Sequence, residues 1–300
     1  MLKRHPAWRL IGAVLLTTAL FVASGCGGGA PAEVSVNVKS SEAPQPASEI
    51  GPNGGTPPSV TPGQPGRITG TVTFDGTPPS LPLLADSSKI KPDEASVCKP
   101  ELIGNDSLVV NPDNKGVAFV FVYLEKLPRG VTAPKSELPT LVFDNKNCRF
   151  VPHGIFVQTG QTVNVTNSDP ILHNTHTFPK RTPQFNQAIP PAGAPLPLTY
   201  ARPEQLPVEV KCDLHTWMKG LHLVLDHHWG AVTDEDGRFE LPELPPGRYE
   251  LKVWHERPGL LERSRRVQVD GDVELNLSYG AARFARYEGP RPKSVTVASR

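Results

Sequence analysis

Short segments of alternating or continuous apolar residues recur along the chain from residue 67 onward. Residues 67–74 alternate, with Ile68, Val72 and Phe74 on one face and threonines on the other, which predicts a half-buried strand. Residues 117–124 form a continuous apolar run, which is typical of a strand buried on both faces. No stretch of ten or more residues keeps a helical period, so the pattern predicts an all-β protein made of sandwiches. Further strands are predicted at 140–143, 154–158, 162–166, 208–212, 221–225, 238–241, 248–253, 266–269 and 273–277.

The composition agrees with many short strands joined by turns. The chain has 34 prolines and 26 glycines, together 60 of 300 residues or 20%, against about 12% in an average chain. Proline removes a helix hydrogen-bond donor and glycine weakens helices, so a mainly helical protein is excluded. Part of this excess lies in residues 26–66, where bulky apolar residues are almost lacking. Such a segment cannot bury enough surface to offset its ordering entropy, and we predict a disordered tether.

Residues 1–25 have the layout of a secretory signal peptide. A basic start is followed by an apolar stretch, residues 10–22, which is too short to span a bilayer. The sequence Ala-Ser-Gly then precedes Cys26. This ending resembles a bacterial lipobox, although a larger aliphatic residue is usual in place of the alanine, and it implies that the thiol of Cys26 carries diacylglycerol. We expect a lipid-anchored protein of the bacterial cell envelope that faces the periplasm or the exterior. Secretion without a lipid is the alternative.

The charges do not point to a nucleic-acid partner. The chain has 31 basic and 30 acidic residues and a formal net charge of +1, and positive charge is not concentrated as on a nucleic-acid-binding surface. Residues 281–300 include five basic residues among many polar ones, and we predict a polar tail there.

The cysteines give the first indication of chemistry. With Cys26 set aside, three cysteines remain, which is an odd number for a compartment where disulfides form. One of them should therefore have another role. Residues 212–218 combine a cysteine, a histidine and a methionine in the spacing C-x-x-H-x-x-M, and His173 lies upstream. Two imidazoles, a thiolate and a weak axial thioether suit copper in electron transfer.

These segments resemble a small blue-copper cupredoxin of the amicyanin and plastocyanin-like group. The resemblance rests on residues 160–167, on the HN-x-H sequence that starts at His173 and on the loop 212–218. It implies a Greek-key β-sandwich over residues 127–226. It also implies that Asn174 hydrogen-bonds the thiolate and pins the ligand loop to the neighbouring strand. The ligands of one type 1 copper ion would be His173, Cys212, His215 and Met218.

Three residues beside the expected ligands depart from that family. Lys211 stands where an aromatic or apolar residue is usual, Thr216 stands where proline is common, and Trp217 is unusually large. These departures bear on the reduction potential and on the exposure of His215, and they leave the ligand set intact.

Copper is not the only interpretation of these residues. A zinc ion could bind one cysteine and two histidines, with Asp213 or water as the fourth ligand, or the sandwich could have lost its metal. We predict a carrier, not an enzyme, that passes single electrons between redox partner proteins of the envelope. Copper storage or delivery and a metal-free surface-binding module are the alternatives.

The other cysteines and histidines are expected to be structural. Cys98 and Cys148 lie in polar, turn-like sequence outside the ligand loop, and we expect them to form a disulfide. His153 is expected to have a hydrogen-bonded structural role. Four more histidines crowd the same part of the chain, namely His176, His222, His227 and His228. A surface metal site is conceivable for these four, but solvated histidines at a strand end fit the pattern better.

Residues 227–280 resemble the carboxypeptidase regulatory-like, or transthyretin-like, sandwich. The resemblance rests on an Asp-Gly turn at 236–237 and a Pro-Pro-Gly turn at 245–247, each followed by a strand. About 50 residues are too few for such a prealbumin-like sandwich, and residues 70–78 fit the opening strand of that family. We therefore predict that residues 67–126 complete this small second sandwich and that the cupredoxin-like domain is inserted between.

Two further features of this second unit have expected structural roles. The acidic residues 234–236 lack the spacing of a known Ca²⁺ loop, so a solvated turn is expected. Trp254 is expected to pack between the two units. A catalytic role for His255 and Glu256 has no partner in the sequence.

Overall fold

The structure is a computed structural model that describes residues 63–99, 101, 103–127, 130–132 and 138–285. The predicted signal peptide, Cys26 and nearly all of the predicted tether lie outside the described residues, as do residues 286–300. No helix in the described ranges is long and apolar enough to cross a membrane.

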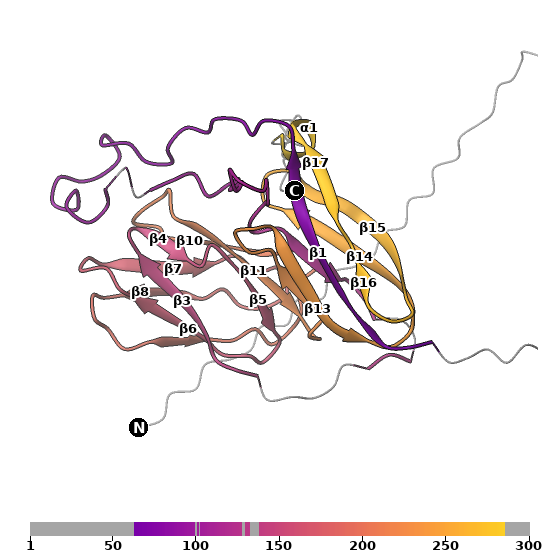
Figure 1. Cartoon of the computed structure of the whole chain (residues 1–300). Coiled ribbons are helices and arrows are strands. Elements are labelled where there is room, and N and C mark those ends of the chain that lie inside the picture. Colours follow the sequence, from indigo (N-terminus) through magenta and orange to yellow (C-terminus); the bar gives the residue numbers. More distant parts are fainter. Residues whose placement is uncertain (1–62, 100, 102, 128–129, 133–137, 286–300) are drawn as a thin grey trace, which may run out of the picture. The chain divides into compact units, whose positions relative to one another are not determined.

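Strands make up almost all of the regular structure, so the all-β prediction is confirmed (Figure 1). The strands are β1 (Gly66–Asp75), β2 (Phe121–Leu124), β3 (Leu141–Lys146), β4 (Arg149–Val151), β5 (Gly154–Gln158), β6 (Val163–Asn167), β7 (His173–Thr177), β8 (Asn186–Ile189), β9 (Leu196–Leu198), β10 (Val208–Lys211), β11 (Lys219–Leu225), β12 (Gly230–Val232), β13 (Arg238–Leu244), β14 (Gly247–His255), β15 (Gly259–Val269), β16 (Val273–Glu274) and β17 (Leu277–Gly280). One short helix, α1 (Ala281–Phe284), follows β17.

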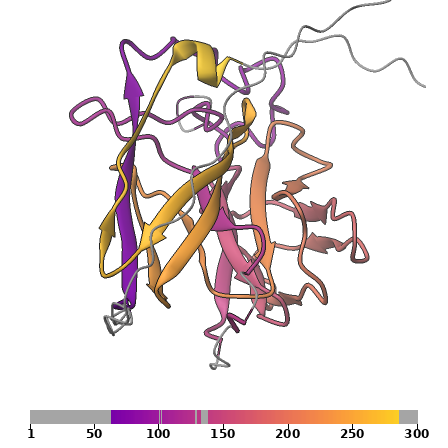
Figure 2. The same ribbon diagram turned by 90° about the vertical axis from the view of Figure 1, so that its right-hand side faces the viewer.

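One sandwich joins strands from both ends of the described chain. In its first sheet, β1 pairs antiparallel with β13 and parallel with β16 and β17, so the indigo strand lies beside yellow ones (Figure 2). The second sheet has the order β12-β2-β14-β15. Alternate apolar residues of both sheets fill a shared core that includes Ile68, Val72, Leu251 and Val253. We call this unit the terminal sandwich.

The middle of the chain forms the other sandwich, which we call the central sandwich. One sheet has the order β5-β11-β10-β7-β8, and the facing sheet has the order β4-β3-β6-β9. Phe143, Val163, Val165 and Val210 are completely buried in its core. The alternation of apolar and polar residues in β6 and β10 therefore matches one buried and one partly exposed face.

A third apolar cluster joins the two sandwiches. Phe121 and Tyr123 of β2 pack with Leu221, Leu223 and Leu225 of β11. The residues that alternate with these point the other way, those of β2 into the core of the terminal sandwich and those of β11 into the core of the central sandwich. Both strands are therefore buried on both faces, which explains their nearly continuous apolar sequences.

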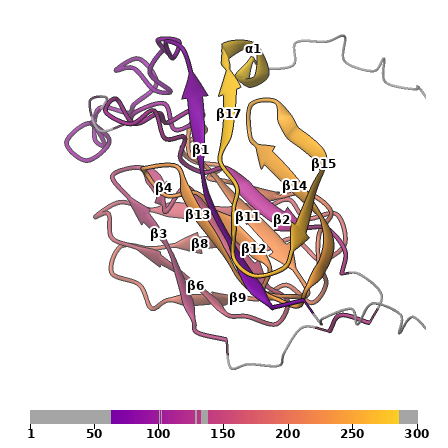
Figure 3. The same ribbon diagram turned by 45° about the vertical axis from the view of Figure 1, so that its right-hand side comes forward.

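The connection between β1 and β2 leaves the terminal sandwich and packs on the central one. Ala85, Ile90, Cys98 and Ile103 are buried in the central core. The purple connection extends over the end of the central sandwich near β4 and β10 (Figures 1 and 3). Cys98 forms a disulfide with Cys148, with the two Cα atoms 5.3 Å apart. This connection differs from the prediction, which assigned all of residues 67–126 to the terminal sandwich.

Several predicted boundaries need correction. The run 117–124 is a regular strand only from Phe121, because Phe119 has a φ of 60° and interrupts the extended backbone. The pattern missed β7 and β8, whose residues are mostly polar, and the three-residue strands β4, β9 and β12. The predicted polar tail begins too early, because Phe284 in α1 is 1% exposed and stacks on Phe74 with the ring centroids 5.4 Å apart.

Replacing Cys98 and Cys148 together with serine should destabilise the protein by about 4 kcal/mol, because an open chain gains the loop entropy that the bridge removes. The bridge joins residues 50 positions apart. The measurement is the free energy of unfolding in guanidinium, followed by tryptophan fluorescence. The parent protein unfolded in the presence of a reductant should show the same loss. Equal stability of the double variant and the oxidised parent would contradict the prediction.

Candidate metal centre

His173 is the first residue of β7 and follows a tight polar turn. In that turn the side-chain oxygen of Asn167 accepts a hydrogen bond of 3.0 Å from the backbone N–H of Asp169. The Asn167 amide group donates to the backbone oxygens of Ile171 and Ile189, at 2.8 Å each. These bonds place His173 at the end of the central sandwich, with its side chain completely buried.

Cys212 and His215 lie in the seven-residue connection between the antiparallel strands β10 and β11. Two backbone bonds close this loop: Cys212 N–H donates to Met218 O at 3.4 Å, and Met218 N–H donates to His215 O at 2.8 Å. The backbone N–H of His215 also lies 3.4 Å from Cys212 Sγ. The short loop therefore places the imidazole of His215 next to the sulfur of Cys212, the residue that directly follows β10.

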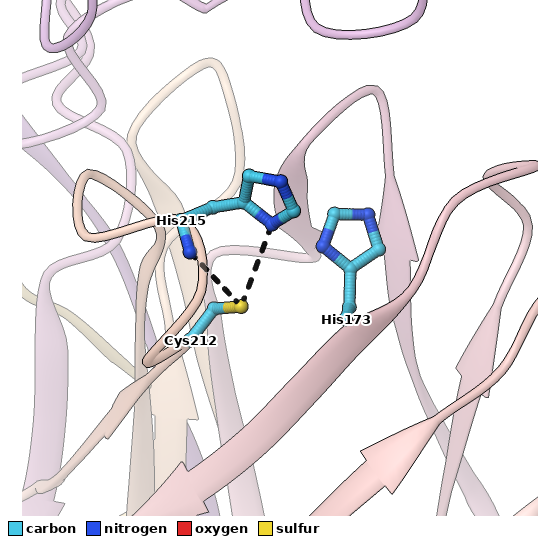
Figure 4. A group of neighbouring side chains, drawn as sticks. All are labelled: His173, Cys212 and His215. Carbon is cyan, nitrogen blue, oxygen red and sulfur yellow. Dashed lines mark hydrogen bonds between the residues drawn. The ribbon is translucent and has the colours of Figure 1, made fainter. Parts of the chain in front are cut away.

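The structure brings together His173, Cys212 and His215, which are three of the ligands expected from the sequence. One ligand atom each of His173, Cys212 and His215 lies within 4.8 Å of the other two, and all three side chains are buried. Nδ1 of His215 is 3.6 Å from Cys212 Sγ (Figure 4). Nδ1 of His173 is turned toward the same point and has no hydrogen-bond partner among the described residues. A buried imidazole nitrogen without a partner is costly unless something binds it.

A carboxylate fixes the orientation of the His173 ring. Nε2–H of His173 donates to Oδ2 of Asp169 at 2.9 Å. Because an ionised carboxylate only accepts, Nε2 carries the proton and Nδ1 is the nitrogen left for a ligand bond. Asp169 is itself held by the backbone N–H groups of Asn147 and Cys148, at 2.7 and 2.8 Å. Burial opposes ionisation of Asp169, but the hydrogen bonds from His173 and these amides outweigh it and lower the pKa of its carboxyl.

A second carboxylate, which the sequence analysis did not identify, holds the other ring. Oε2 of Glu94 lies 3.1 Å from Nε2 of His215. Glu94 lies in the connection between β1 and β2, 121 residues away in sequence, so no local motif points to it. His215 is only 1% exposed as a result of this and neighbouring contacts.

Asn174 connects the ligand loop to β7 by hydrogen bonds, which is the role that the resemblance implies for this residue. Its side-chain oxygen accepts a 2.7 Å hydrogen bond from the backbone N–H of Asp213 and lies 3.3 Å from Cys212 Sγ. Its amide group donates to Asp213 and Asn186, at 2.8 and 2.9 Å. The amide oxygen accepts a hydrogen bond from the sulfur only while Cys212 is a thiol. A thiolate is stabilised instead by the backbone N–H of Asn174.

The two imidazoles favour the ionised form of Cys212. Burial alone disfavours the thiolate, but the neighbouring imidazoles of His173 and His215 and backbone amides outweigh it and lower the pKa of Cys212 to about 6. Burial also opposes protonation of His173, whereas Asp169 and the thiolate raise its pKa. In the metal-free protein the centre therefore resembles a thiolate–imidazolium pair. A metal ion can bind in place of the proton of the imidazolium, beside the thiolate.

The donor set fits copper. One thiolate and two imidazoles match a soft cation that also accepts nitrogen ligands, and the site is buried and held by hydrogen bonds. Met218, the fourth residue of the expected set, is 1% exposed, and its side chain packs in the central core. Asp213, the alternative fourth ligand for zinc, points elsewhere, because its side chain is half exposed and bonds to His176, Asn174 and Asn186.

The crowded histidines do not form one surface group. His176 lies 3.1 Å from Asp213. The expectation of solvated histidines is wrong for His222 and His227, which are 0% and 1% exposed. Burial lowers the pKa of His222 to about 3, and its Nδ1 lies 2.8 Å from the Tyr200 hydroxyl oxygen, within hydrogen-bond distance. His222 is a buried residue of β11 and therefore belongs to the core.

His153 lies between two carboxylates. Its Nε2 is 3.4 Å from Glu256 of the terminal sandwich, and its Nδ1 is 4.0 Å from Asp106. Lys219 also reaches Glu256 at 3.4 Å. These groups line a cavity of about 270 Å³ whose wall includes Met218. The structure thus places His153 beside the ligand loop, outside the three-residue cluster.

Neither a protein-family model nor a curated protein matches this chain. Three solved structures show partial similarity to this chain. The copper-containing nitrite reductase NirK from Thermus scotoductus SA-01 is 21% identical over 33% of this chain and 25% of its own, with a TM-score of 0.27. A methionine-to-alanine variant of amicyanin in the Cu(I) state is 19% identical over 28% of this chain and 81% of its own, with a TM-score of 0.26. A purple cupredoxin from Nitrosopumilus maritimus is 21% identical over 28% of this chain and 97% of its own, with a TM-score of 0.24.

These similarities are low, and the match spans only a quarter of the nitrite reductase. The structural neighbours are cupredoxins and a protein that contains copper. What the centre of this chain can bind follows from its own atoms.

The thiol of Cys212 should titrate with a midpoint near pH 6 in the metal-free protein, well below the range of an ordinary thiol. The thiolate should persist above that pH and be lost below it, because the lowered pKa reflects stabilisation of the ionised form. The measurement is the ultraviolet absorbance of the thiolate as a function of pH. Subtracting the curve of Cys212→Ser removes the contribution of Cys26. A midpoint of about 8.5, the value of a free cysteine, would contradict the prediction.

Proposed function

We propose that this protein is a blue-copper carrier of single electrons, in which His173, Cys212 and His215 hold one type 1 copper ion. The unpartnered Nδ1 of His173, turned toward the Cys212 sulfur, is the observation that carries the proposal. Bound copper would supply the chemistry by alternating between Cu(II) and Cu(I), which takes up and releases one electron. We also assign Met218 as the weak fourth ligand, because it ends the same closed loop and is buried.

The protein contributes rigidity and the exclusion of water. Asp169 and Glu94 hold the outer nitrogens of the two imidazoles, and Asn174 fixes the loop that carries the sulfur. Rings held in this way keep their positions when the charge of the site changes. A site whose geometry is the same before and after electron transfer has a small reorganisation energy, so the barrier to the transfer is low.

A carrier fits these residues better than an enzyme does. In the described part of the chain, the other cluster of ligand-type atoms consists of Cys148, Asp169 and His173. It shares His173 with the first cluster and includes a disulfide-bonded cysteine. A redox partner protein would approach near the exposed Leu172 and Leu214, which are 46% and 45% exposed. Each of these leucines directly precedes an assigned ligand histidine.

Copper loading tests this function. The full chain, purified without metal and mixed with Cu(II), should bind one equivalent and show an intense thiolate-to-copper charge-transfer band. Cys212→Ala and His173→Ala should lose the band. His176→Ala is the matched control, because His176 belongs to the same strand and bonds to Asp213, and it should keep the band.

The same titration separates the alternatives. One equivalent of colourless copper that does not exchange electrons with a small redox mediator would favour storage or delivery. No stoichiometric copper would favour a metal-free binding module. Tight zinc binding in preference to copper would overturn the assignment of the metal.

We further propose that the carrier is lipid-anchored in a bacterial cell envelope through Cys26 and held off the membrane by the tether. The basic start, the short apolar stretch and the following cysteine support this location. When the full gene is expressed in a bacterium, the protein should fractionate with membranes and Cys26 should carry a diacylglycerol mass. Cys26→Ser should remove both. Release of the parent protein as an unmodified soluble chain would contradict the proposal.

A further inference from the structure

A segment that precedes β2 covers the metal centre of the central sandwich. Residues 84–99 belong to the connection between β1 and β2, yet Ala85, Ile90 and Cys98 are buried in the central core. The segment contains no helix or strand and is held by its own turns. In those turns the backbone oxygen of Glu94 accepts hydrogen bonds of 2.9 Å from Val97 and from Cys98.

Glu94 places a negative charge on the outer side of His215. Its Oε2 is 3.1 Å from Nε2 of His215, and its Oε1 is 3.0 Å from Nζ of Lys91. The Glu94 side chain is 14% exposed and that of His215 is 1% exposed. A partly buried carboxylate in this position leaves Nδ1 of His215 as the free nitrogen, on the side of Cys212.

A disulfide connects the segment that carries Glu94 to the turn that holds Asp169, the carboxylate on the other ring. Cys98 follows Glu94 and forms a disulfide with Cys148. The backbone N–H of Cys148 donates to Asp169, which holds His173. Both imidazoles are thus oriented by carboxylates that the same disulfide fixes in place.

We propose, on the basis of the copper function above, that Glu94 is a positioning residue for the ligand His215 and that residues 84–99 are a built-in cover for that ligand. A carboxylate that accepts from Nε2–H makes Nδ1 a stronger donor. It therefore favours Cu(II) over Cu(I) and lowers the reduction potential. The covered ring does not itself reach solvent, so a partner meets the centre through neighbouring residues.

The experiment compares reduction potentials and spectra of the copper-loaded full chain. Glu94→Gln removes the charge with almost no change in shape. It should weaken the preference for Cu(II) over Cu(I) roughly tenfold, which raises the one-electron potential by about 59 mV. Glu94→Asp keeps the charge but shortens the reach, and it should also raise the potential. Asp93→Asn removes the neighbouring exposed charge and should leave the potential unchanged.

Two outcomes on the loaded protein would overturn the proposal. If Glu94→Gln and Asp93→Asn have the same potential as the parent, the contact with His215 does not act on the metal. If Glu94→Asp matches the parent while Glu94→Gln does not, the charge acts at a distance and Glu94 does not position the ring.

A readout without metal separates this proposal from the copper function. In metal-free protein labelled with ¹⁵N-histidine, Nε2–H of His215 should give a slowly exchanging NMR signal that is lost in Glu94→Asp and kept in Asp93→Asn. If the parent binds no copper, the proposed function fails, and this signal still decides whether Glu94 holds and covers His215. A rapidly exchanging signal in the parent would overturn the cover.

Discussion

Burial of the Cys212 thiolate is the constraint on which the rest of the candidate metal centre depends. A charged sulfur removed from water is costly unless hydrogen bonds or a cation compensate it. Here two imidazoles and backbone amides surround the sulfur, and they lower the pKa of the thiol despite its burial. The imidazoles in turn need partners on their outer nitrogens, which Asp169 and Glu94 provide. The site is therefore a series of hydrogen bonds, each dependent on the one before, that starts at the sulfur of Cys212.

Cys148 is the point at which this chain is tied to the fold. Its sulfur joins the cover through Cys98, its N–H holds Asp169, and its carbonyl oxygen accepts a 3.0 Å hydrogen bond from the Trp217 indole. Trp217 lies beside His215, with the ring centroids 5.2 Å apart. The large residue that departs from the cupredoxin pattern thus has a partner that the pattern alone could not show. A disulfide near the centre holds the ligand turn, the ligand loop and the cover together.

The terminal sandwich supports the centre indirectly. β2 and β11 share an apolar cluster, and β11 begins directly after the ligand loop. The connection that leaves β1 returns to β2 only after it has covered His215. The terminal sandwich therefore contributes to the site, because the connection that carries Glu94 and orients His215 starts and ends in it.

The sequence by itself determined the all-β class and indicated Cys212, His215 and Met218 as candidate ligands. Strand periodicity and the spacing of Cys212, His215 and Met218 are local properties, so they can be recognised without knowing the fold. The alternation also predicted that β1 is half-buried, but the pattern missed the short strands β4, β9 and β12. It also missed β7 and β8, whose polar residues serve the site and its hydrogen bonds.

Only the tertiary structure decided which carboxylates meet the two imidazoles and which histidines are buried. Glu94 reaches His215 across 121 residues, and His222 and His227 are buried by strands that come from elsewhere in the chain. Such contacts depend on how distant strands pair and on where a long connection packs. A linear pattern of apolar and polar positions carries no information about those distances, because it specifies the face of an element and not its neighbour.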